Sequence, residues 1–229
     1  MNQSVLASDL KTLPFFEGLG EDVLEQLLTQ HRVNQVEANQ TLVMEADWGD
    51  TLMILLEGLA KVRTINTDGE ETVLSLVGRG DLLGEMSLLD GQPRSADVVT
   101  LVPVRILKLN GKIFLRYVQS NTTLAFQLAR LQSRRLRDAN QRLSIQRSDA
   151  TSRVLFAIAY LARKSSGSDD PLSPTANIPQ GEIAILAGLA RETSSRTMSK
   201  LRSRGTIRDD DGVLRIASAD ALRKRGLYP

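Results

Sequence analysis

Apolar residues near the N-terminus recur with the period of a helix. Four of them fall at positions i, i+1, i+4 and i+5 and so share one helical face: Val23, Leu24, Leu27 and Leu28. The segment "SDLKTLPFF" before them has the composition of a further helix, with Ser8 as its N-cap. We therefore predict that this N-terminal segment is helical.

From Val33 to Leu109 the pattern changes to short runs rich in Val, Ile, Leu and Thr, separated by turn signals. One of these turns is Asn66–Gly69, where Gly69 can supply a positive φ. Many short strands with evenly spaced turns favour an antiparallel barrel or sandwich over a βαβ fold.

Residues 112–147 contain neither glycine nor proline and are good helix formers. Their leucines recur at helical spacings: Leu124, Leu128, Leu131, Leu136 and Leu143. The segment predicts one amphipathic helix of roughly 35 residues, about 50 Å long. A single small barrel is too short to cover such a stripe, so we expect two subunits to share this helix. A helix packed only on its own chain is the alternative.

The C-terminal part predicts a helix–turn–helix followed by a hairpin. The helical segments are "ATSRVLFAIAYLARK", "PQGEIAILAGL" and "RETSSRTMSKLRSRG", with the loop "SSGSDDPLSPTAN" after the first and a turn at Gly188 before the last. The segment "TIRDDDGVLRIAS" predicts a short hairpin that turns at Asp211–Gly212.

The last of these helices has two different faces. One face is suited to packing: Ser194, Thr197, Met198 and Leu201. The opposite arc is polar: Arg191, Glu192, Ser195, Arg196 and Ser199. Arginine can bind guanine bidentately and glutamate can accept from cytosine N4, which suits this arc to the DNA major groove. The alternative is a charged face that contacts only solvent.

Composition removes many chemistries. The chain of 229 residues is 41% hydrophobic and 24% charged, as expected for one large or two small globular domains. It has no cysteine and one histidine, His31, which excludes disulfides, iron–sulfur clusters, cysteine nucleophiles and multi-histidine metal sites. Apolar runs stop well short of the ~20 residues that span a membrane. The N-terminus has neither a basic n-region nor an apolar h-region, so we do not expect secretion. We expect a cytoplasmic binding protein and not an enzyme.

The net charge of +2 conceals an asymmetry. Residues 148–229 hold 13 Lys and Arg against 9 Asp and Glu, whereas the remainder holds 16 against 18. A basic C-terminal part is compatible with a nucleic-acid partner without demonstrating one.

The stretch "DLLGEMSLLDGQPRSADV", residues 81–98, combines the carboxylate of Glu85 with the guanidinium of Arg94. Three interpretations are open: a reactive carboxylate, a pocket for an anion, or a structural ion pair. General acid–base catalysis is disfavoured because the sequence offers no second catalytic group.

Three segments together resemble the catabolite-activator/fumarate-nitrate-regulator (CRP/FNR) superfamily of bacterial transcription factors, in particular its cyclic-nucleotide-binding group. "GDTLMILLEGLAKV" is similar to its central hairpin, "GEMSLLDGQPRSA" to its phosphate-binding cassette and "ARETSSRTMSKL" to its recognition helix. The resemblance covers nearly the whole chain. It implies an α+β fold: an antiparallel β-barrel or jelly-roll cyclic-nucleotide-binding domain (1–110), a long dimerisation helix (111–147) and a winged helix-turn-helix (148–229).

The resemblance also implies a ligand pocket. Arg94 would bind the cyclic phosphate, Ser95 would add a hydroxyl and Glu85 would accept from the ribose 2′-OH. In this family an arginine on the long helix pairs with the cassette glutamate, which implies an Arg134–Glu85 contact. The implied ligand-binding residues are Leu76, Leu83, Gly84, Glu85, Met86, Ser87, Arg94, Ser95, Arg134, Asp138, Ala139 and Asn140.

The sequence departs from the family pattern at several positions. The threonine that hydrogen-bonds adenine is absent: one alignment puts that pair at Asp138–Ala139 and another at Ala139–Asn140. The family usually has glycine where this chain has Asn39 and Ala46. Because alanine tolerates left-handed geometry poorly, we expect the turn at Ala46 to differ.

In the recognition helix, Arg191, Glu192 and Arg196 match the family's base-reading trio and Thr193 matches a phosphate contact, whereas Ala190 replaces a frequent serine. The trio implies palindromic sites with a TGTGA-like core. The implied DNA-binding residues are Arg191, Glu192, Thr193, Ser195, Arg196, Ser199 and Lys200.

The resemblance implies an allosteric homodimer that binds double-stranded DNA and RNA polymerase but no membrane. Its allosteric ligand would be cyclic AMP, with cyclic GMP as an alternative, and it would use no catalytic cofactor or metal. The second hypothesis is a regulator of the same family that responds to a different effector or to none. Haem would need axial ligands, and His31 is the only histidine.

Overall fold

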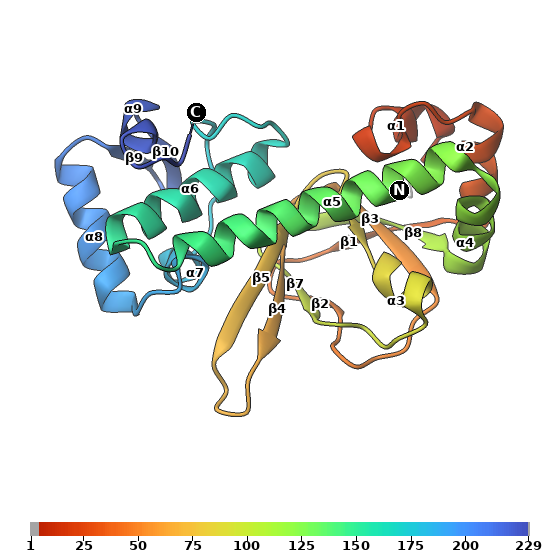
Figure 1. Ribbon diagram of the computed structural model, residues 1–229, viewed down its shortest axis with the longest axis horizontal. Helices are drawn as coiled ribbons and strands as arrows, with labels where there is room; N and C mark the ends of the chain where they lie inside the picture. The colour runs from red at the N-terminus through yellow and green to blue at the C-terminus, as the bar shows by residue number, and fades with distance from the viewer. Residues whose placement is uncertain (1–4, 229) are drawn as a thin grey trace. The chain divides into compact units, whose positions relative to one another are not determined.

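The computed structural model describes residues 5–228 (Figure 1). Contacts divide the chain into two units. The first unit comprises the residues up to Val62 together with Val77–Arg137. The second comprises Arg63–Leu76 together with the chain from Asp138 onward.

The N-terminal segment is helical, as predicted. It forms α1 (Ala7–Lys11), the 3-10 helix η1 (Pro14–Phe16) and α2 (Glu21–Leu27). The predicted Ser8 cap is wrong: Ser8 lies inside α1, and Leu6 occupies the N-cap. Asp9 provides the capping contact instead, because its Oδ2 accepts from the Leu6 N–H at 2.9 Å.

Two four-stranded sheets follow. Their strands are β1 (Arg32–Val36), β2 (Thr41–Val43), β3 (Thr51–Glu57), β4 (Ala60–Ile65), β5 (Glu71–Val77), β6 (Leu82–Leu83), β7 (Asp97–Thr100) and β8 (Val104–Asn110). The strand orders are β1-β8-β3-β6 and β2-β7-β4-β5. Apolar side chains from both sheets form one buried cluster that includes Met53, Val98 and Ile106. The predicted α+β class is confirmed, with jelly-roll sheets in place of a closed barrel.

The predicted single long helix is wrong. The segment forms α4 (Gly111–Ser120) and α5 (Thr122–Ile145), separated at Asn121, whose backbone is extended (φ −120°, ψ 107°). The Asn121 side chain accepts a hydrogen bond from the Leu124 N–H at 2.9 Å and so begins a new helix. α5 has 24 residues and is therefore about 36 Å long.

The leucines of α5 serve two purposes. Leu124 and Leu128 are buried in the core of the first unit, and Leu131 packs against that core. Leu136 and Leu143 are each 63% exposed. The single stripe expected from the sequence is thus split between the protein's own core and an exposed face.

The C-terminal elements follow the prediction. They are α6 (Ala150–Ser166), α7 (Gln180–Ala187), α8 (Arg191–Ser203), β9 (Ile207–Asp210), β10 (Val213–Ile216) and α9 (Asp220–Arg223). Gly188 ends α7 in the left-handed conformation (φ 59°), and Asp211–Gly212 turns the hairpin with both φ values positive. The helix–turn–helix and its following hairpin are confirmed.

The β4–β5 hairpin bonds to α6 within the second unit. Its predicted turn is confirmed, with Gly69 at φ 79°. The Leu76 N–H donates to the buried Tyr160 hydroxyl at 3.0 Å. The Arg142 guanidinium lies 5.8 Å from the centre of the Tyr160 ring, which is cation–π geometry.

The expectation that the turn at Ala46 differs is wrong. Ala46 keeps the left-handed conformation (φ 65°), as does Asn39 (φ 61°). The Ala46 N–H donates to the Arg94 carbonyl at 2.9 Å, and the Arg94 N–H donates to the Asp47 carbonyl at 2.8 Å. These two bonds hold a strained alanine against the backbone of Arg94.

We predict that Ala46→Gly stabilises the first unit. Left-handed geometry costs a non-glycine residue about 1–2 kcal/mol, and glycine avoids this cost. The greater freedom of glycine in the unfolded chain cancels only part of the gain. We expect a net gain of about 1 kcal/mol and a Tm raised by roughly 2–4 °C. The single tryptophan, Trp48, lies in this unit and reports its unfolding by fluorescence. Asn39→Gly is the matched control and should gain less, because asparagine tolerates this conformation. A lower Tm for Ala46→Gly would contradict the strain.

Candidate functional site

The carboxylate of Glu85 is buried and held by the long helix. Gly84, at φ 88°, precedes α3 (Glu85–Asp90), and the Glu85 side chain is only 1% exposed. Its Oε1 pairs with the Arg135 guanidinium and accepts from Gln132 Nε2 at 3.3 Å. Arg135 also donates to the carbonyl of Leu82. The cassette helix is thereby joined to α5.

The expected Arg134–Glu85 contact is wrong by one residue. Successive helical residues point about 100° apart, so only one of two neighbouring arginines can meet this carboxylate. α5 presents Arg135, whereas Arg134 lines a separate cavity. Sequence reasoning also missed Gln132, because nothing in the sequence marks one glutamine on a polar helix face as a partner of Glu85.

Arg94 is 6% exposed and hydrogen-bonds to the backbone at the start of α3. Its Nη1 donates to the Gly84 carbonyl and its Nη2 to the Thr51 carbonyl, both at 2.8 Å. Burial lowers the pKa of the Arg94 guanidinium, and the carboxylates of Glu85 and Asp50 oppose part of that effect. An arginine stays charged in proteins and has five N–H donors, so three donors of this cation remain for an anion.

Two glycines leave room for this arginine. A Cβ atom at Gly49 would lie 2.7 Å from Arg94 Nη2, and one at Gly84 would collide with Nη1. The close approach of backbone to guanidinium therefore requires glycine at both positions.

The other predicted ligand-binding residues are spread over both units. In the first unit, Met86 and Ser95 are exposed, Ser87 is half-buried and Leu83 is buried in the apolar cluster. The remaining four lie in the second unit: Leu76, Asp138, Ala139 and Asn140. The structure thus brings together Gly84, Glu85 and Arg94, and the role of the others stays a prediction.

Helix α8 has the two faces that its sequence predicts. The packing face is buried: Ser194, Thr197, Met198 and Leu201. The opposite side chains are exposed: Arg191, Glu192, Ser195, Arg196, Ser199 and Lys200. Thr193 is half-buried, and no side chain caps the helix at Ala190. The exposed arc carries three cations and one carboxylate, which are side chains suited to the DNA major groove.

In residues 5–228, no three side chains of metal-ligating type form a cluster, and no helix is both long and apolar enough to cross a bilayer. The lone histidine, His31, lies with its Nδ1 2.6 Å from the Leu28 carbonyl oxygen.

Known proteins resemble both parts of the chain. Residues 33–121 match the cyclic nucleotide-binding domain family, and residues 152–225 match the Crp-like helix-turn-helix domain family. The chain is 31% identical to the cyclic AMP receptor protein of Thermus thermophilus over 94% of this chain and 97% of that protein. The chain belongs to the CRP/FNR family. It is therefore a transcription regulator, not an enzyme, with a cyclic-nucleotide-binding domain and a DNA-binding helix-turn-helix.

A further relative and a solved structure are also similar to this chain. A CRP-like cAMP-activated global transcriptional regulator of Mycobacterium tuberculosis is 28% identical over 92% of this chain and 95% of its own length. FixK2 from Bradyrhizobium japonicum shares the fold, with a TM-score of 0.73 at 16% identity, over 87% of this chain and 98% of its own.

We predict that Arg135→Gln destabilises the first unit, because it removes the cation that is paired with the buried Glu85 carboxylate. Breaking a fully buried pair costs about 3–5 kcal/mol, and the Arg135 side chain is 31% exposed, so we expect about 1–3 kcal/mol. Urea unfolding followed by Trp48 fluorescence measures the change.

The double variant Glu85→Gln/Arg135→Gln should recover part of this loss, since it removes the buried charge as well. Arg137→Gln, an exposed arginine of the same helix, is the control and should stay within about 0.5 kcal/mol of wild type. If Arg135→Gln behaved like Arg137→Gln, the pair would not stabilise the cassette.

Proposed function

We propose that this chain is a homodimeric, cyclic-AMP-responsive transcription regulator that binds palindromic DNA. The observation that carries the proposal is the buried Glu85–Arg135 pair, which joins the cassette to α5. In the family resemblance that helix serves both dimerisation and recognition of the base. A ligand that changes the cassette therefore acts on α5 directly. We also propose a cytoplasmic location, with RNA polymerase as a further partner.

The ligand fits the chemistry of the cassette. A 3′,5′-cyclic phosphate is a monoanion. The buried guanidinium of Arg94 is a cation with three N–H donors that are not used by the Gly84 and Thr51 carbonyls. The Ser95 hydroxyl is exposed and available to the same phosphate. Glu85 is the acceptor for the ribose 2′-OH, with Arg135 and Gln132 fixing its orientation.

The Arg135 pair favours one of the two sequence alignments. The alignment that places the adenine-contacting pair at Asp138–Ala139 pairs Arg134 with the cassette. The alignment on "RRLR" shifts both positions by one, to Arg135 and to Ala139–Asn140. The contact seen at Arg135 supports the second alignment, and we propose that Asn140 donates to and accepts from the base.

The exposed face of α5 supports the homodimer. Phe126, Leu136 and Leu143 are 63–66% exposed there. With the exposed residues between them they recur at alternating spacings of three and four: Phe126, Ala129, Ser133, Leu136, Asn140 and Leu143. That 3.5-residue period is typical of helices paired in a coiled coil, and a polar Asn140 within it favours one register.

The dimer sets the DNA target. Arg191, Glu192 and Arg196 are exposed near the N-terminal end of α8, where a helix-turn-helix reads bases. We propose TGTGA-like half-sites arranged as a palindrome. Cyclic AMP promotes DNA binding only if it binds the DNA-competent arrangement more tightly than the other.

We predict that calorimetry detects cyclic AMP binding by wild type and that Arg94→Ala weakens it roughly 100-fold or more, since a charge-assisted phosphate contact is lost. Cyclic GMP titrated in parallel tests the base preference. Arg116→Ala, an exposed arginine of the same unit, is the control, and Trp48 fluorescence confirms that each variant folds. Equal binding by wild type and Arg94→Ala would show that the cassette is not the nucleotide site.

We predict that saturating cyclic AMP strengthens binding to a TGTGA palindrome over a scrambled duplex, as measured by fluorescence anisotropy. Arg196→Ala should cost about 1–3 kcal/mol and reduce discrimination between the duplexes, whereas Lys200→Ala should weaken both nearly equally. DNA affinity that did not change with cyclic AMP would contradict the allosteric mechanism and favour the alternative, a CRP/FNR regulator with another effector or none.

A further inference from the structure

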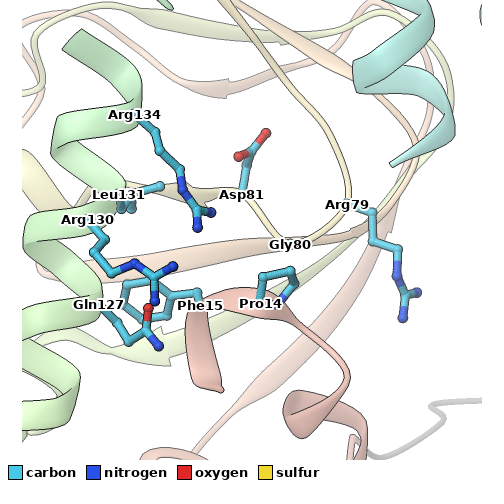
Figure 2. A pocket seen from close by; sticks show the side chains of 9 residues that line it. All are labelled: Pro14, Phe15, Arg79, Gly80, Asp81, Gln127, Arg130, Leu131 and Arg134. Atoms are coloured by element: carbon cyan, nitrogen blue, oxygen red, sulfur yellow. The ribbon is translucent and has the colours of Figure 1, made fainter. Parts of the chain in front are cut away.

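A second cavity lies in the first unit, outside the cassette. It has a volume of about 100 Å³ and lies between η1, the turn at Gly80 and α5 (Figure 2). Arg79, Arg130 and Arg134 line it together with a single carboxylate, Asp81. The wall of the cavity therefore carries an excess of positive charge.

Two of these arginines have nothing to pair with in residues 5–228. Arg130 and Arg134 lie one helical turn apart on α5, and the described chain gives neither a hydrogen bond nor an ion pair. Figure 2 shows both guanidinium groups extending from α5 toward the space beside Phe15. Like charges at i and i+4 destabilise a helix, so an anion between them would relieve an unfavourable contact.

The other charged side chains of the cavity are already engaged. Arg79 donates to the Leu56 carbonyl at 3.3 Å and to Thr12 Oγ1 at 3.2 Å. Asp81 accepts from the Gly78 N–H at 2.8 Å. Arg130 and Arg134 are thus the donors that remain for a ligand.

The size and the walls of the cavity limit the ligand. A water needs about 10–15 Å³ of such space, so the cavity holds on the order of seven waters, which is enough for a small oxyanion. Phe15 and Leu131 provide apolar walls, and Arg130 and Arg134 are themselves exposed, so a ligand can reach them from solvent. Arginine pairs suit phosphate and carboxylate oxygens, which accept in fork geometry.

We propose that this cavity binds a small oxyanion, such as inorganic phosphate or the carboxylate of a small metabolite, through Arg130 and Arg134. The site goes beyond the nucleotide pocket and does not depend on which nucleotide that pocket takes. Binding in this cavity would also affect the nucleotide pocket, because Arg134 immediately precedes Arg135, which pairs with Glu85. An anion that fixes this turn of α5 also restrains the contact between helix and cassette.

The test is a calorimetric titration with inorganic phosphate at constant ionic strength, in the presence of saturating cyclic AMP so that Arg94 is occupied. Wild type should bind phosphate, and Arg130→Gln/Arg134→Gln should bind it at least about tenfold more weakly. Arg137→Gln, an exposed arginine outside the cavity, should bind as wild type does. The titration is repeated without nucleotide to separate the two sites. If cyclic AMP does not bind at all, the difference in phosphate binding between wild type and the double variant still tests the cavity.

Three outcomes would overturn the proposal. The first is that wild type binds phosphate no better than chloride. The second is that the double variant binds phosphate as tightly as wild type. The third is that Arg137→Gln loses as much phosphate affinity as the double variant. Sedimentation equilibrium distinguishes the source of the anion. If the double variant dissociated into monomers more readily and phosphate had no effect, the two arginines would bind a carboxylate of a second copy and not a free oxyanion.

Discussion

The structure of the first unit depends on one buried carboxylate. Glu85 is almost fully removed from water, and a charge in that position is strongly unfavourable unless a cation and hydrogen bonds replace the solvent. Arg135 and Gln132 provide them, and both come from α5. The cassette can therefore shift only if α5 shifts with it or the carboxylate loses its partners. This constraint joins the short cassette helix α3 to α5 within the first unit.

A second buried charge completes the cassette. Arg94 holds the Gly84 and Thr51 carbonyls with its side chain and binds the strained turn at Ala46–Asp47 through its backbone. The left-handed alanine persists because the surrounding hydrogen bonds outweigh its cost. The arginine is thus oriented by protein groups before any ligand arrives, which lowers the ordering cost of binding an anion.

Within the second unit, strand β5 is bonded to α6. Strand β5 carries Leu76, whose N–H is bonded to the Tyr160 hydroxyl of α6, and Arg142 of α5 lies over the same ring. Leu76 is also a predicted wall residue of the nucleotide pocket. A buried hydrogen bond of this kind is costly to break, so it links the hairpin to α6, which packs on α7 and α8.

The sequence by itself determined the fold class, the helix–turn–helix, the two faces of α8 and the presence of Glu85 and Arg94 in one short cassette. These features depend on local periodicity, turn residues and short-range motifs, which a single chain displays directly. Only the tertiary structure decided that Asn121 divides the long helix, that Arg135 and not Arg134 meets Glu85, and that Arg130 and Arg134 share a cavity. The break at Asn121 depends on a local cap within a run of good helix formers, and the other two depend on which side chain reaches across from another element. Neighbouring residues of identical chemistry, such as the two arginines, differ only in the direction they point, and that direction is set by packing.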